Sequence, residues 1–132
     1  MFRFPDEWQG LAYPHVRVAL IDYLDEIGDP ARTGAWRELA PGESQAGVRQ
    51  LLFFLFDAHD FGPAAIGLFL LDGGEVALIA ALKRLLAEIA IETPGRGSAQ
   101  FLDHPLWPEV ITAAAAARDA LAAHGRPIWV EE

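Results

Sequence analysis

The sequence predicts an all-α fold, a single globular domain over residues 1–132 built as a bundle of about four helices with irregular loops. Four segments place apolar residues at helical spacing. The chain of 132 residues has the usual length of one domain, and 52% of its residues are hydrophobic, which is enough for one core. Cysteine is absent, which excludes disulfide scaffolds and Cys-ligated zinc.

The first two predicted helices differ in how much of their surface is apolar. The first begins near Pro14, a favoured first helical residue, and ends at about Ile27, before Gly28, with one apolar stripe. The second follows Ser44, a good N-cap, and is apolar on all sides, which is typical of a buried, central helix. A buried strand across Leu51–Phe56 is the alternative for its apolar run.

The third and fourth predicted helices have clear start and stop signals. Asp72-Gly-Gly-Glu75 resembles a capping box, and the almost wholly apolar stretch Val76–Ile91 that follows predicts a second central helix. The fourth helix runs from about Trp107 to His124 and is stopped by Gly125.

The remaining segments are predicted to be loops and docked ends. A long loop is expected at Gly28–Glu43 and a shorter one at Thr93–Leu102. Both ends of the chain are aromatic and apolar, so we expect them to dock on the bundle, beside each other or against a second subunit; these residues are Phe2, Phe4, Trp8, Ile128, Trp129 and Val130.

The charge of the chain excludes several classes of partner. Asp and Glu number 19 against 10 Lys and Arg, a formal net charge of −9 at pH 7. Phosphate contacts need a basic face, so this balance argues against nucleic acid and equally against an anionic membrane. The chain has no signal-peptide pattern and no apolar run near the ~18 residues of a membrane span. We therefore expect a soluble, cytoplasmic protein.

A histidine–aspartate pair is one candidate for chemistry. His59-Asp60 ends the second predicted helix and is the adjacent pair typical of metal-dependent HD phosphohydrolases, in which His15 and Asp103 could supply the further ligands. The simpler interpretation is that His59 caps the last carbonyl groups of its helix, where a cation is favoured. A covalent hydrolase is disfavoured because neither serine lies in a nucleophile elbow.

A second candidate site precedes the last helix. Asp103, His104 and Glu109 could line a ligand-binding cleft with Trp107 as its wall. The alternative is structural: Asp103 caps a helical turn, His104 lies on the surface and Trp107 is a packing anchor.

Four carboxylates gather at the end of the first predicted helix. Asp22, Asp25, Glu26 and Asp29 put like charges at a helix C-terminus, where the dipole disfavours anions. They form either a solvated face or a docking patch for a basic partner, whose complementary charge would speed encounter and set specificity. Arg32 close by neutralises part of the charge.

The second half of the chain resembles a family of short bacterial hypothetical proteins. The likeness covers roughly residues 66–120 and includes the runs Gly67–Ile79, Ser98–Val110 and Ala117–Ala120. Its features are a glycine before an apolar run, an acidic helix start and a Trp-Pro-Glu that opens the last helix. The resemblance implies a small, stand-alone, cytoplasmic protein and carries no activity, cofactor or catalytic residue.

The sequence thus favours a non-enzymatic protein–protein interaction module without a cofactor. An immunity- or antitoxin-like role fits, with a basic protein as partner, and a homodimer is the other form of association. The alternative function is a small HD-like, metal-dependent hydrolase that uses His15, His59, Asp60 and Asp103. A bundle with an apolar ligand pocket near Trp107 is a third hypothesis.

Overall fold

The computed structural model describes residues 2–38, 47–93 and 97–129, and these residues form six α-helices. The α-helices are α1 (Pro14–Ile27), α2 (Pro30–Gly34), α3 (Val48–Leu52), α4 (Gly73–Glu92), α5 (Ser98–Leu102) and α6 (Trp107–Ala122). The π-helix η3 (Phe53–Ala58) continues α3, and the 3₁₀ turns are η1 (Asp6–Trp8), η2 (Ala35–Glu38) and η4 (Pro63–Ala65). Strands β1 (Phe2–Arg3) and β2 (Ile128–Trp129) have two residues each. The all-α prediction is confirmed, while the expected number of helices was too low.

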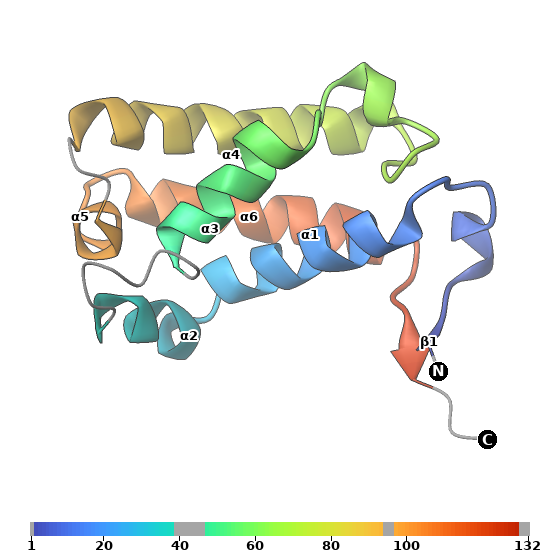
Figure 1. The fold of residues 1–132 in the computed structure, drawn as a ribbon, viewed down its shortest axis with the longest axis horizontal. Helices are drawn as coiled ribbons and strands as arrows, with labels where there is room; N and C mark the ends of the chain where they lie inside the picture. Colours follow the sequence, from blue (N-terminus) through green and yellow to red (C-terminus); the bar gives the residue numbers. More distant parts are fainter. Residues whose placement is uncertain (1, 39–46, 94–96, 130–132) are drawn as a thin grey trace.

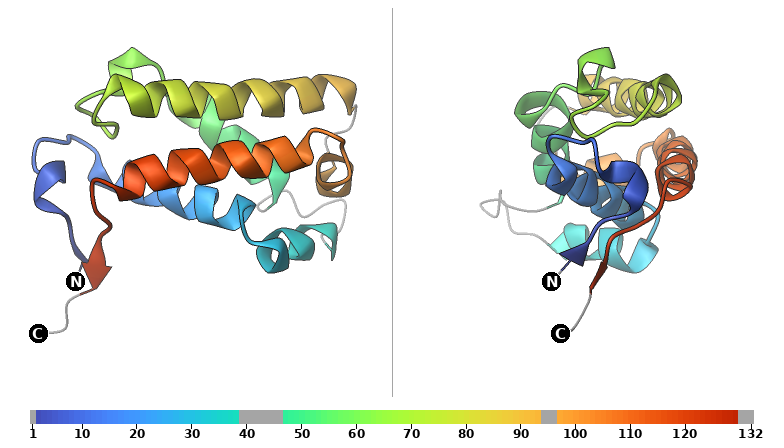
Figure 2. Two further views of the ribbon diagram at one scale, coloured as in Figure 1. Left: turned by 180° about the vertical axis from the view of Figure 1, so that it is seen from behind. Right: turned by 90° about the vertical axis from the view of Figure 1, so that its right-hand side faces the viewer.

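Three long helices form the body of the molecule (Figure 1). Helices α4 and α6 run side by side, and α6 also packs along α1, so α6 joins the other two. The pair α3–η3 crosses this group obliquely, whereas α2 and α5 lie together at one end and the two chain termini lie at the other (Figures 1 and 2). Ala114 and Ala117 of α6 are fully buried, and these small side chains let neighbouring helices approach closely.

The helix that was expected to be central lies at the side of the bundle. Its start at Ser44 falls outside the described residues, and from Val48 onward the segment is helical, so the alternative of a strand is wrong. Leu51 and Leu55 are buried, but Phe53 is 58% exposed. The place between two neighbours is taken by α6, which is rich in alanine and packs against both α4 and α1.

The two additional helices, α2 and α5, lie inside segments that were predicted to be loops. Asp29 caps α2 through a hydrogen bond from the backbone N–H of Ala31 (3.0 Å), and Pro30 occupies the first helical position. At α5, the Ser98 hydroxyl accepts a hydrogen bond from the N–H of Val48 at 3.2 Å. Each helix has five residues, too few for the apolar spacing to repeat.

The chain ends pair with each other, which is one of the arrangements expected from the sequence; Val130 lies outside the described residues. Strands β1 and β2 are antiparallel, with Phe2 opposite Trp129. Trp8 is buried, stacks on Phe4 at 5.7 Å between ring centres, and donates a hydrogen bond to the carbonyl of His124 (3.2 Å). The N-terminal segment is thus fastened to the end of α6.

Candidate functional site

The predicted acidic patch is engaged in contacts within the chain. Asp22 and Glu26 both accept from Arg32, at 3.4 and 3.1 Å. Glu26 also accepts a 2.7 Å hydrogen bond from the indole N–H of Trp36. These contacts attach the C-terminal half of α1 to the α2–η2 segment.

The other two acids of the patch have structural partners as well. Asp25 binds Arg126 with two contacts, at 3.0 and 3.2 Å, which connects α1 to the chain end. Hydrogen bonding and charge from Asp25 raise the pKa of Arg126. Asp29 is the N-cap of α2. The four acids therefore do lie near the same end of α1, where each helps to hold the fold together.

His59 lies in an aromatic cluster. Its ring meets the edges or faces of three phenylalanines at 5.1–6.2 Å between ring centres; these are Phe54, Phe61 and Phe69. Asp60 folds back to accept a hydrogen bond from the N–H of Gly62 at 2.8 Å. The pair therefore supports packing and a tight turn.

The other two residues of the proposed HD-type site lie elsewhere. His15, at the start of α1, packs edge-on against Phe4 at 5.2 Å. Asp103 follows α5, at the opposite end of the bundle (Figure 1), and binds both terminal nitrogens of Arg37 at 2.7 and 3.2 Å. This contact lowers the pKa of Asp103 and raises that of Arg37. No group of three or more His, Asp or Glu residues in the described part of the chain is placed to hold a metal ion, so the structure does not assemble this site.

The residues predicted to line a cleft near the last helix also have separate roles. Trp107 is buried and meets Trp36 edge-to-face at 6.3 Å, in agreement with a packing anchor. His104 accepts from the N–H of Leu106 through Nδ1 (3.0 Å), so Nε2 carries the proton that it shares with Glu92 at 2.6 Å. Glu109 is exposed in the first turn of α6.

A buried ion pair, which the sequence analysis missed, connects α1 to α4. Arg17 is 0% exposed and Glu75 1%, and the guanidinium binds both carboxylate oxygens at 2.7 Å. Arg17 also donates to the carbonyls of Phe69 (3.2 Å) and Leu121 (3.3 Å), and Glu75 accepts from the N–H of Leu71 (2.8 Å). The signal in the sequence was Arg17 itself, since it lies on the apolar stripe of its helix. The pair is closed to solvent, so it serves the fold rather than a substrate.

His124 borders this pair at the surface. Its Nδ1 lies 2.5 Å from Glu7, while Nε2 lies 3.5 Å from Asp72 and 3.9 Å from Glu75. The hydrogen bond with Glu7 and the nearby carboxylates raise the pKa of His124, against partial burial and the charge of Arg17. The pKa of Asp72 is lowered, chiefly by the hydrogen bond from the backbone N–H of Glu75.

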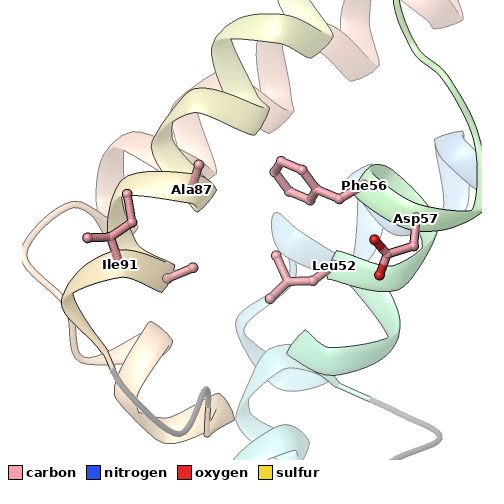
Figure 3. A pocket seen from close by; sticks show the side chains of 6 residues that line it. Leu52, Phe56, Asp57, Ala87 and Ile91 are labelled. Carbon is pink, nitrogen blue, oxygen red and sulfur yellow. The ribbon is translucent and has the colours of Figure 1, made fainter.

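An open apolar groove lies between α3–η3 and the C-terminal half of α4 (Figure 3). Its volume is about 340 Å³, and it is lined by Leu52, Phe56, Asp57, Ala87, Ala90 and Ile91. Phe56 and Leu52 point toward α4, whereas the side chain of Ile91, at the end of the groove, points away from them. Phe56 is 41% exposed and Ile91 81% exposed, a costly placement for large apolar side chains.

The π-helix η3 forms one wall of this groove. Phe56 and Asp57 both belong to η3, and π-helical turns are rare and often occur at functional sites. The ammonium group of Lys83 lies over the rings of Phe56 and Phe61, at 4.9 and 5.6 Å from their centres. Five of the seven large, exposed apolar side chains in the described residues lie between residues 53 and 91, the stretch that includes both η3 and α4. Two of these five, Phe56 and Ile91, line the groove.

None of the helices in the described residues is both long and apolar enough to cross a membrane.

The comparisons with known proteins identify a family. No curated protein and no solved structure matches the chain. Residues 11–126 match the family described as a domain of unknown function (DUF7945), a span that includes all six α-helices, the buried ion pair and the groove. The match is longer than the segment of roughly residues 66–120 that resembles an uncharacterised family in the sequence. This protein therefore belongs to the DUF7945 family of domains of unknown function.

Proposed function

We propose that this protein is a non-enzymatic protein–protein interaction module and that it docks its partner in the groove between α3–η3 and α4. The observation that carries the proposal is the groove itself, in whose lining Phe56 and Ile91 are exposed. Contiguous apolar surface on a folded domain commonly marks a site of interaction, because covering it removes apolar area from water.

The use of the charged side chains supports the same proposal. The histidines and carboxylates that were candidates for chemistry pack on aromatic rings, cap helices or form ion pairs, as His59, Asp29 and Asp103 illustrate. These contacts stabilise the fold and occupy the side chains that a reaction would need. The net charge of −9 favours a basic partner, in keeping with an immunity- or antitoxin-like role.

The acidic patch of Asp22, Asp25, Glu26 and Asp29 is the competing docking surface. Its carboxylates would have to release Arg32, Arg126 or the start of α2 before binding a partner fully. The groove requires no such exchange. We therefore place docking in the groove and use the acidic patch as the comparison surface in the test.

Site-specific photo-crosslinking in the native host tests the proposal. A photoreactive phenylalanine analogue is placed at Ile91 in the groove, at Asp22 in the acidic patch, or at Thr112, which is exposed on α6. We expect one discrete adduct from position 91, its loss when Ala87→Gln fills the groove, and none from position 112. An adduct from position 22 alone would move docking to the acidic patch. No discrete adduct from any position would refute the interaction module.

A further inference from the structure

We infer that the groove receives one face of an amphipathic helix that carries a basic side chain to pair with Asp57. The inference rests on the proposed function and specifies its partner. Three features of the groove lead to it: the architecture of its walls, the size of the side chains at its base and the distribution of charge around it.

The walls of the groove favour a helical partner over an extended one. Both walls are helices whose backbone groups bond within the helix, so this part of the surface presents no strand edge to which an extended peptide could add. Leu52 and Phe56 stand one helical turn apart on one wall, and Ala87 and Ile91 stand one turn apart on the other. An amphipathic helix offers its apolar residues at the same spacing, so its side chains can pack between these rows.

The alanines on α4 allow such a helix to approach closely. Ala87 and Ala90 are the smallest side chains of the lining, and the larger Ile91 follows them along α4. The volume of about 340 Å³ is at the lower end of the roughly 300–1,000 Å³ of ligand pockets. An open space of this size suits a few side chains of a longer partner better than an entire enclosed ligand.

The charge around the groove favours a basic residue on the partner. Asp57 is exposed on the wall, and the ion pairs formed among the described residues do not include it. The neighbouring cation, Lys83, is already placed over two aromatic rings. A second copy of this chain is a poor occupant, because each copy brings a net charge of −9.

Selection from a helical peptide library tests the inference directly. The library fixes leucines at positions i, i+4 and i+7 and varies the flanking positions among Lys, Gln and Glu; it is selected against the wild-type protein and counter-selected against the groove-filling variant Ala87→Gln. We expect enrichment of peptides with Lys at one fixed flanking position. Failure of the library to enrich on the wild type over the filled variant, or enrichment of Glu, would overturn the inference.

Titration of an enriched peptide by fluorescence anisotropy then identifies its partner residue. We expect Asp57→Asn to weaken binding about tenfold, as one lost charge pair in a desolvated contact would do, and Asp119→Asn to change it less than twofold. Asp119 is a matched control because it is an exposed acid of α6, outside both groove walls. Equal effects of the two variants would overturn the role of Asp57. A positive crosslink from Ile91 together with a failed selection would refute the helical, basic partner and leave the interaction module standing.

Discussion

The buried ion pair provides the sharpest test of what holds this fold together. In Glu75→Gln the side chain keeps its shape and loses its charge, and the oxygen that accepts the N–H of Leu71 can remain. Arg17, which is 0% exposed, then keeps its positive charge without the carboxylate that bound it at 2.7 Å. The carbonyls of Phe69 and Leu121 still accept from the guanidinium, but they carry no full charge.

The expected loss is large because a buried charge is left without its counter-ion. Removing one partner of a buried pair costs about 3–5 kcal/mol, against a total stability of about 5–15 kcal/mol for a domain. For a chain of 132 residues this loss corresponds to a fall in Tm of roughly 10–20 °C. The variant should therefore fold at low temperature and unfold well before the wild type.

Thermal and urea unfolding, followed by circular dichroism, measure the effect. In Arg17→Met/Glu75→Gln we expect part of the lost stability to return, because neither charge remains buried. Asp103→Asn is the control: it also removes a 2.7 Å contact with an arginine, Arg37, but both partners are exposed, so little change is expected. A Glu75→Gln variant as stable as the wild type, or a double variant no more stable than Glu75→Gln alone, would refute the reasoning.

Three further predictions concern the helix ends. Glu7 raises the pKa of His124. The stability that protonated His124 contributes is therefore fully present below its ordinary pKa of 6.5 and is lost as the pH rises through the raised pKa. The urea midpoint of the wild type should fall over this range, whereas that of His124→Gln, measured between about pH 5 and pH 9, should lack this decline. Parallel curves for the two proteins would contradict this assignment. Asp72→Ala removes the N-cap of α4 and should cost about 0.5–2 kcal/mol in urea unfolding, with Asp72→Asn keeping most of the stability. Gly125→Ala should lower Tm, because the glycine has φ +96° and an added Cβ would lie 2.7 Å from Pro5; an unchanged Tm would mean that this turn relaxes freely.

The long helices could be predicted from the sequence because their signals are local. Pro14 and Gly28 enclose α1, and Trp107 opens α6, as expected. Asp72 caps α4 as the sequence indicates, through the N–H of Glu75 at 2.9 Å. Helical period and capping depend on residues within about four positions of one another, so a short segment of sequence is enough to recognise both.

The capping box shows where local reasoning ends. Its pattern predicts that the Glu75 side chain turns back to the N–H of Asp72, whereas this side chain accepts from the N–H of Leu71, one residue earlier, and binds Arg17, 58 residues away in the sequence. The five-residue helix α5 begins at Ser98, which accepts from the N–H of Val48, 50 residues away, and α2, although capped locally by Asp29, is too short for its apolar spacing to repeat. No spacing rule within either segment contains that information.

Composition and helical spacing are sufficient to predict an acidic, all-helical chain with its apolar residues on helical faces. Which of those faces are covered becomes clear from the packing of the helices. The alanines of α6 let it pack against two helices, whereas Phe56 of η3 and Ile91 of α4 remain exposed at an open groove. The physical reason is that apolar spacing specifies a face, while burial of that face depends on the shape and charge of a distant segment that meets it.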